Sequence, residues 1–453
     1  MFDTSKKLKL PMRNFRLILT LLFSALTLCL SGQDLISGNA QVTNDSIRHY
    51  RYDTLDSKQL ETTYRLIDSL SKEEEKHFNR FSNLQNTLIS GKIPVYVFDI
   101  KLNDIVNYNI GNGFMLGLGL ETNYRLSKTF SIGGFGNYWF KAKEFNYGGK
   151  LDFRIMKSKD MRVKLAYSHK FERLGDYGFM ENSSVFNPNN FKYFYVNATS
   201  LNDAISLDYS TYINRYLKGF IGFEVADKTY NGQRTTDNGQ QIYRLSTIDF
   251  RLRIAFGEKF IQSKDGLTVD GDANPVIWIS YQKNLKNIFN SPYDFDKAEL
   301  LFRGKKHTKH LGETSLSAQL GFINGSVPVT ELFNIYGTGE NKIDLYCLES
   351  FSTMRPDEFF CDKFGALFFS HNFKNLLIDF KKFHPEIILL TNIAWMSIIE
   401  PQNLYCESGI VIDNIINTGI CKLGLGAFYR YGPYSFDKTW DNFVFKISIG
   451  FSL

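Results

Sequence analysis

The end of the chain constrains the fold more than any other stretch. Between Asn442 and Leu453 every second residue is apolar: Phe443, Phe445, Ile447, Ile449, Phe451 and Leu453. The residues between them are polar or small, apart from Val444. Since successive side chains of a β-strand point to opposite faces, this alternation predicts one strand with two unlike faces. A chain that stops on such a strand has no later residues to cover the apolar face.

The wall of an outer-membrane β-barrel gives such a strand lipid on one side and a lumen on the other. We expect the strand to pair back to the start of the sheet, because unpaired backbone groups cannot be left in hydrocarbon. We also interpret its six apolar residues as the insertion signal for the machinery that places barrels in the outer membrane. Outer-membrane lipids are the other partner that this pattern predicts.

The first 32 residues are typical of a secretory signal peptide. Five basic residues precede a 14-residue apolar run from Leu17 to Leu30, which is too short to span a bilayer comfortably. Cys29, Ser31 and Gly32 offer a cleavage site near residue 32. Cys29 is alternatively a lipoprotein cysteine, although Leu28 stands where that recognition needs a small residue. No later stretch approaches the length of a transmembrane helix, so a membrane location requires a barrel.

The composition suits one large barrel. Of the 453 residues 15% are aromatic and only 10 are proline, and strands favour aromatic residues and exclude proline. The net charge of +6 is spread along the chain and does not indicate nucleic-acid binding. Four cysteines follow the cleavage site: Cys347, Cys361, Cys406 and Cys421. They are small apolar residues or form one disulfide, and none has zinc-site spacing, so we expect no metal or cofactor.

Residues 33–92 differ from the rest of the chain. Apolar residues recur there at helical spacing in two groups: Leu60, Tyr64, Ile67 and Leu70, then Phe78, Phe81, Leu84 and Leu88. This spacing predicts a periplasmic leader with two short amphipathic helices. The segment from Gly91 to Pro94 then stops the second helix and begins extended chain. The barrel domain is therefore expected to cover residues 93–453.

From residue 93 the period of the pattern changes to two. Clear alternation covers 114–121, 145–155, 161–168 and 248–256, with a possible first strand at 94–108. Weaker runs lie near 204–214, 216–226, 276–283, 294–303, 313–322, 364–371, 387–397 and 419–430. We expect an all-β, antiparallel transmembrane barrel of 14 to 16 strands, and 16 is our choice, since single-chain barrels have an even number.

Connection lengths support this interpretation. The connections at 125–128, 157–160 and 214–217 are tight, as periplasmic turns are, whereas 172–202, 228–244 and 323–363 are long, as outer loops are. The connection 257–274 is longer than a periplasmic turn should be. A soluble β-sandwich also has alternating strands, but its core would be smaller than so many aromatic strands demand.

Five stretches resemble a family of outer-membrane barrels of unknown function that is widespread in Bacteroidota. They occur in the family's order: 113–123, 145–149, 256–260, 351–359 and 428–434. Members often carry the label of a carboxypeptidase-like regulatory domain, which is absent here, and the resemblance implies no peptidase activity. The family is in turn distantly similar to the outer-membrane assembly-factor barrels. That similarity implies a role in inserting or exporting proteins or lipids, although this chain lacks their repeated periplasmic modules and their Arg-Gly-Phe or Arg-Gly-Tyr motif.

Charged residues on the polar faces of the expected strands are predicted to face the lumen: Lys150, Asp152, Arg154, Arg162, Lys164, Asp249, Arg251 and Arg253. Such charges either select solutes by sign or pair across strands to fill a narrow barrel. A second cluster is a candidate plug or loop motif: Thr353, Arg355, Asp357, Glu358 and, as a charged partner, Arg430. It is expected either to form a polar site or to keep the pore closed.

Two function classes follow from these patterns. The first is transport or assembly across or into the bacterial outer membrane, and the second is a structural or surface-interaction barrel with a plugged lumen. An outer-membrane hydrolase comes third and would need a base beside a nucleophile. The candidate bases are His169, His307, His310, His371 and His384. Because no Gly-x-Ser-x-Gly motif accompanies them, we predict no enzyme activity and no catalytic residues.

Overall fold

The computed structural model describes residues 91–176, 188–230, 241–263, 266–270, 273–378, 384–397, 404–417 and 421–451. The expected signal peptide, nearly all of the expected helical leader, and Leu453 lie outside these residues. The chain forms two compact units, and the larger one consists of Leu84–Ile415 and Leu423–Gly450. Among the described residues, no helix is long and apolar enough to cross a membrane.

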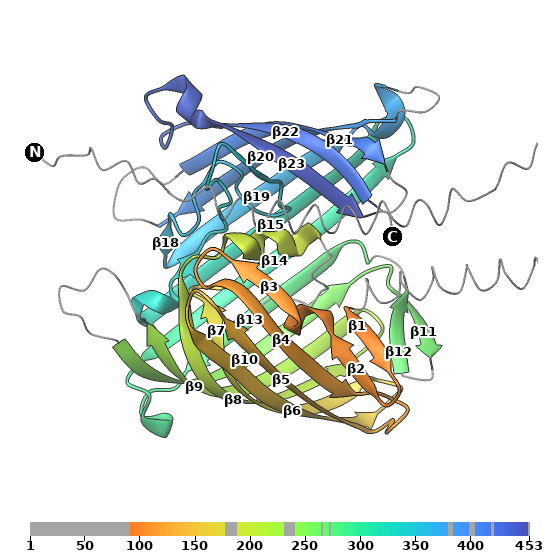
Figure 1. Cartoon of the computed structure of the whole chain (residues 1–453), viewed down its shortest axis with the longest axis vertical. Helices are drawn as coiled ribbons and strands as arrows, with labels where there is room; N and C mark the ends of the chain where they lie inside the picture. The colour runs from red at the N-terminus through yellow and green to blue at the C-terminus, as the bar shows by residue number, and fades with distance from the viewer. Residues whose placement is uncertain are drawn as a thin grey trace, which may run out of the picture. The chain divides into compact units, whose positions relative to one another are not determined.

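One 19-stranded sheet dominates the larger unit. Its first ten strands are β1 (Lys92–Val95), β2 (Phe98–Lys101), β3 (Val106–Asn109), β4 (Gly113–Thr122), β5 (Phe130–Trp139), β6 (Glu144–Met156), β7 (Met161–Arg173), β8 (Thr199–Tyr212), β9 (Leu217–Tyr230) and β10 (Gln241–Ala255). The later strands are β13 (Val276–Asn284), β14 (Asp294–Thr308), β15 (Gly312–Ser326), β17 (Ile343–Leu345), β19 (Lys363–Asn372), β20 (Glu386–Met396), β21 (Leu404–Asn417), β22 (Cys421–Tyr431) and β23 (Phe443–Phe451). Figure 1 shows β20 to β23 side by side.

Within the described residues, sixteen strands of this sheet form the wall. Both β2 and β3 pair with β4, on either side of the short 3-10 helix η2 (Leu102–Asp104), so they act as one interrupted strand. The short strands β1 and β17 are additions at the edges of the sheet. When β1 and β17 are left out and β2 and β3 are counted as one strand, sixteen strands remain. Sixteen is the number expected from the sequence. Neighbours pair antiparallel, and only the pairing of β17 with β23 is parallel among the registers described.

Exposure in this sheet is the reverse of that in a soluble protein. Large apolar side chains are exposed at alternate strand positions, for example Leu118, Phe153 and Leu367. The opposite face buries polar and charged side chains: Glu121, Asn137, Glu299, Gln319, Asn392, Glu407, Arg430 and Lys446. Soluble proteins almost never bury charges while exposing alternating apolar residues, whereas a barrel in lipid requires that arrangement. The fold is therefore that of an outer-membrane β-barrel.

Most of the expected strands are confirmed within a few residues, but two were missed. Neither β5 nor β21 was among the expected runs. The expected long first strand over 94–108 is broken into β1, β2 and β3. The long connection after β10 contains a separate hairpin, β11 (Lys259–Ser263) with β12 (Gly266–Asp270), which accounts for its length.

The connection from β15 to β19, residues 327–362, is a folded element that we call the plug. It contains the 3-10 helix η5 (Val329–Glu331), β16 (Phe333–Asn334), β17 and β18 (Phe360–Cys361), and β16 pairs with β18. Its side chains Phe333, Phe351 and Met354 are fully buried. They belong to one apolar cluster with inward residues of the wall: Tyr243, Leu245, Trp278, Phe295, Leu301, Phe364, Ala394 and Tyr405. The main core of the protein thus lies between the plug and the wall.

The expectation that the last strand pairs back to the start of the sheet is wrong. In the described residues β23 pairs on its free edge with β17, and the registers of β1, β2 and β3 contain no partner in β23. The sheet is therefore not closed. Backbone groups of β23 are satisfied instead by the plug: the amide of Phe445 donates to the Lys342 carbonyl, and the amide of Tyr346 donates to the Ile447 carbonyl.

Candidate functional site

The carboxylate of Glu407, on the inward face of β21, holds the plug by its backbone. Its two oxygens accept hydrogen bonds from the amides of Ser352 and Thr353, each at 2.8 Å, and from the Thr353 hydroxyl at 2.7 Å. Asn392 of β20 donates a fourth hydrogen bond at 2.8 Å. The Glu407 side chain is fully buried, so these four donors replace the water that a carboxylate otherwise needs. The geometry fixes the strand wall and the plug in one register.

Lys446, on the inward face of β23, provides a second anchor. Its ammonium donates to the Thr338 carbonyl at 2.8 Å and lies 4.0 Å from a carboxylate oxygen of Asp344 in β17. It also lies 5.6 Å from the centre of the Tyr195 ring. Because Lys446 is almost fully buried, its charge is balanced by the plug rather than by solvent.

Glu358 and Arg430, predicted as possible partners, lie together. The guanidinium of Arg430 donates to Glu358 at 3.0 Å and lies over the rings of Tyr405 and Phe436, at 4.6 and 4.7 Å. Arg355 is exposed, and its backbone amide donates to Glu358. These contacts hold the exposed turn of the plug against β22.

The other predicted motif residues also tie the plug to its surroundings. Asp357 accepts hydrogen bonds from the Ala198 amide at 2.6 Å and from the Asn334 side chain at 2.5 Å. Thr353 contacts Glu407 as described above. The motif is therefore a set of internal contacts within the sheet's concave side, and whether the plug closes a pore stays a prediction.

Three further contacts join the plug to strands β7, β9 and β14. Lys228 of β9 donates to Glu331 at 2.8 Å, and Arg173 of β7 donates to the Asn334 carbonyl at 2.7 Å. Arg303 of β14 forms a bidentate ion pair with Glu349, in which Nε and Nη2 of the guanidinium each lie 2.5 Å from a carboxylate oxygen. Burial raises the pKa of the Glu349 carboxyl, but the Arg303 guanidinium outweighs that effect and holds the pKa below its usual value.

A second segment, 191–197, links the two edges of the open sheet. The amides of Ile110 and Gly111, at the end of β3, donate to the carbonyls of Phe194 and Val196, each at 3.0 Å. On the other side the Tyr195 hydroxyl accepts a hydrogen bond from the Leu345 amide at 2.8 Å. We call the boundary between β23 and β3 the seam. It is bridged by β17 and by this segment, which includes the end of the 3-10 helix η3 (Pro188–Tyr195), drawn between the two edges in Figure 1.

A cavity of about 940 Å³ lies on the inward face of β4 to β10. Six of the predicted lumen-facing residues line it: Lys150, Asp152, Arg162, Lys164, Asp249 and Arg251. Arg154 instead lines a smaller cavity of about 320 Å³ near the β4–β5 turn, and Arg253 pairs with Glu258 at 2.7 Å.

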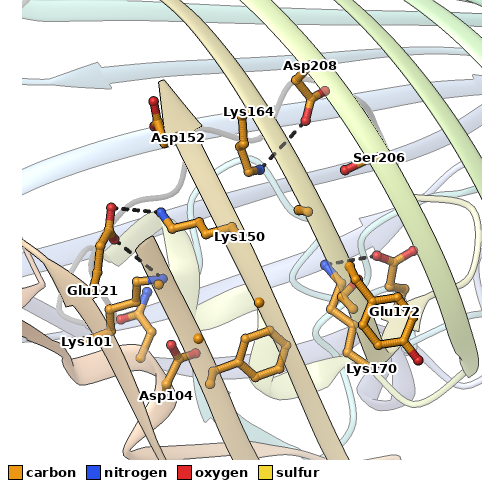
Figure 2. Close-up of a pocket in the computed structure, with 18 of the residues that line it drawn as sticks. Lys101, Asp104, Glu121, Lys150, Asp152, Lys164, Lys170, Glu172, Ser206 and Asp208 are labelled. Atoms are coloured by element: carbon orange, nitrogen blue, oxygen red, sulfur yellow. Dashed lines mark ion pairs between the residues drawn. The ribbon is translucent and has the colours of Figure 1, made fainter. Parts of the chain in front are cut away.

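The charges of the large cavity are balanced and paired. Seven basic and seven acidic residues line it, so its walls have no formal net charge. Figure 2 shows Glu121 between Lys150 and Lys101, at 3.0 and 3.6 Å, and Lys164 beside Asp208 at 3.8 Å. This arrangement favours cross-strand pairing over a selective ring of one sign.

The remaining candidate groups are cysteines, possible metal ligands and histidines. The four cysteines among the described residues, Cys347, Cys361, Cys406 and Cys421, are buried. No group of three or more potential ligands could hold a metal ion within the part of the chain that the structure describes. His169 contacts Asp203 at 2.6 Å, and His371 contacts Thr314 at 2.9 Å; both lie on strands.

The sequence comparison identifies the family. Residues 89–407 match the family described as "Family of unknown function (DUF5686) C-terminal domain". The chain belongs to this family. The match covers most of the barrel, including the plug and the Glu407 anchor. No curated protein sequence matches the chain.

Three solved structures are similar to the chain at low sequence identity. BamA from Haemophilus ducreyi lacking POTRA domains 1-3 is 10% identical, with a TM-score of 0.49, over 78% of this chain and 70% of that one. CdiB from Escherichia coli is 11% identical, with a TM-score of 0.45, over 78% and 62%. CdiB from Acinetobacter baumannii is 11% identical, with a TM-score of 0.42, over 76% and 58%. The chain thus spans less than two thirds of either CdiB, and none of these values informs on activity.

Sequence reasoning missed the residues that anchor the plug: Asp344, Glu407, Lys446 and Tyr195. Lys446 carried a usable signal, because it is the one charge on the inward face of the last strand. Glu407 lies in a strand that was not predicted. Asp344 and Tyr195 belong to connections whose folding depends on contacts far apart in the sequence.

Proposed function

We propose that this protein is an outer-membrane barrel for transport or assembly, in which the plug controls an opening at the seam. The observation that carries the proposal is the pairing of β23 with β17. A spanning edge is occupied by only three residues in a parallel register, Ile343 to Leu345, where a full antiparallel strand is normal. Such a short pairing can be replaced by a longer extended segment at low cost.

The edge of β23 suits an extended polypeptide. An unpaired strand edge in lipid must find hydrogen-bond partners, and a polypeptide strand supplies them by adding to the sheet. β17 already copies the wall, because Ile343 is exposed beside exposed Phe445 whereas Asp344 faces Lys446 inside. A client strand with the same alternation would fit the same position. We propose that barrel-insertion machinery and outer-membrane lipids are the protein's own partners during its placement, and that members occur in Bacteroidota.

The second candidate is a structural or surface-interaction barrel with a permanently plugged lumen. The fully buried Phe333 and Phe351 favour it, because a well-packed plug resists removal. The two functions differ in whether the seam must open.

A reversible lock of the seam tests the first proposal. Cysteines at Ile343 and Phe445, which are register partners with exposed side chains, would form a disulfide across the β17–β23 pairing. The matched control places cysteines at Ile132 and Leu151, an exposed register pair between β5 and β6. Cells depleted of the protein would be complemented with each variant, and their outer-membrane proteins and lipids would be quantified.

With the seam disulfide oxidised, the outer-membrane proteins or lipids that the depleted cells lack are expected to stay missing. With the disulfide reduced, they are expected to return. The control disulfide should restore them in both states. Full restoration by the oxidised seam lock would contradict the proposal and favour the permanently plugged barrel.

A further inference from the structure

The tight turns at one end of the sheet carry an unexplained surplus of basic residues. Connections between successive antiparallel strands alternate between the two ends, so the turns 123–129, 157–160, 213–216 and 309–311 share an end. Hydrogen bonds link neighbouring turns directly, from the Arg154 amide to the Thr129 carbonyl and from the Tyr212 amide to the Lys159 carbonyl.

Exposed cations gather on these turns and on the adjoining end of β14: Arg125, Lys128, Lys157, Lys159, Arg215, Lys305, Lys306 and Lys309. We call this set the basic belt. In these four fully described turns the only acid is Asp160, which is buried and already bound to Arg162 and Lys218. These four turns therefore offer the belt no exposed carboxylate.

The opposite end is different. Its tight connections 140–143 and 285–293 also carry only lysines as charged residues, but its connection 432–442 contains Asp437, Lys438 and Asp441, and the plug at that end contains seven acidic and two basic residues. The surplus of basic residues is therefore concentrated at one end of the sheet and does not simply reflect the chain's net charge. A surplus of exposed cations at one end creates a positive potential there, which attracts anionic groups.

Each turn combines its cations with an exposed apolar side chain. Leu126, Ile155, Tyr216 and Leu311 are 51%, 63%, 41% and 61% exposed, and each lies within two positions of a belt cation. They continue the exposed apolar positions of the strands outward. An apolar group that enters the acyl layer beside a cation that reaches the headgroups is the arrangement found at membrane interfaces.

We propose that the basic belt binds the anionic headgroups of phospholipids in the leaflet at this end. The apolar side chains fix the depth of the turns, and the ammonium and guanidinium groups contact lipid phosphates. The proposal is independent of the proposed function, because the belt is intact whether or not the seam opens.

The test is lipid binding by the purified full chain in detergent, followed by native mass spectrometry with phosphatidylglycerol and phosphatidylcholine. The belt variant is Lys128→Gln with Lys157→Gln and Lys306→Gln, from two of the turns and the adjoining end of β14. The matched control is Lys143→Gln with Lys286→Gln and Lys438→Gln, three exposed lysines of the opposite end. Faster migration of unheated samples on gels would show that each variant is folded.

The wild-type chain and the control are expected to retain phosphatidylglycerol preferentially, whereas the belt variant loses at least fivefold of that preference. An unchanged preference in the belt variant, or an equal loss in the control, would overturn the proposal. So would displacement of phosphatidylglycerol by an equal concentration of inorganic phosphate, which would indicate a free-anion site. Loss of a co-purifying protein with lipid preference retained would indicate a protein partner and would also overturn it.

Discussion

The buried ammonium of Lys446, on the last strand of the wall, lies 4.0 Å from the carboxylate of Asp344 on the short strand that occupies its edge. This pair joins the two parts whose separation would open the seam. The pair is shielded from water, so each charge depends on the other; Lys446 also donates to the Thr338 carbonyl, and Asp344 accepts from Asn341.

Lys446→Met is expected to loosen the β17–β23 pairing by about 3 kcal/mol, because it leaves the buried Asp344 carboxylate without its cationic partner, held only by hydrogen bonds from Asn341. Hydrogen exchange of the peptide containing residues 343–347 should accelerate by roughly 100-fold. Adding Asp344→Leu to that variant should recover part of the protection, since it removes the orphaned charge. Equal acceleration in the single and double variants would contradict the pairing.

Glu407→Gln should release the plug backbone at Ser352 and Thr353. The amide nitrogen of glutamine would face amide donors, so the loss is about 2 kcal/mol. Hydrogen exchange at 350–355 should rise while exchange in β6 stays constant. Glu121→Gln is the matched control, because it is a buried carboxylate of the wall that contacts lysines rather than the plug. Similar effects from both substitutions would show general destabilisation instead.

Arg430→Lys tests the contact that holds the exposed turn of the plug. Lysine keeps the charge but loses the flat surface that lies over Tyr405 and Phe436, at a cost of about 1 kcal/mol. Hydrogen exchange of the Arg355 and Glu358 amides in this turn should become several-fold faster, as quantified by mass spectrometry of the peptides that contain them. Exchange unchanged from the wild-type rate would mean that the stack does not restrain this turn.

Asp208→Asn should alter ion selectivity once the lumen is open. Asp208 lies 3.8 Å from Lys164 and 3.4 Å from Arg251, so its loss gives the walls of a formally neutral cavity a net charge of about +1, while Arg251 keeps its ion pair with Asp249. In a chain without plug residues 340–358, the chloride-to-potassium permeability ratio should rise roughly twofold, as measured by reversal potential in a salt gradient. Asp296→Asn, which removes a carboxylate bonded to exposed Tyr281, should not change the ratio.

The strand pattern was predictable wherever both faces followed simple rules. β6 alternates Phe145, Tyr147, Leu151 and Phe153 with polar residues, because one face meets lipid and the other a wet cavity. β21 breaks the rule, since its inward residues Tyr405 and Val411 are apolar and fully buried. That face packs against the plug, and the sequence of β21 alone does not indicate this contact.

β5 was missed for another reason. Gly133, Gly134 and Gly136 interrupt its alternation, and glycine carries no side chain that marks a face. β17 was beyond prediction, because three residues in a long connection become a strand only when the edge of β23 is left unpaired. The pairing of Glu358 with Arg430 was anticipated from charge alone, whereas the Glu407 anchor required the fold.

Single-channel conductance in planar bilayers tests the central claim most directly, namely that the plug blocks the lumen and the seam. The intact chain would be compared with a folded variant in which a short glycine-serine linker replaces residues 340–358. We predict that the intact chain is silent or opens only briefly, and that the variant conducts steadily. Steady conductance of the intact chain, or a silent variant, would contradict the claim.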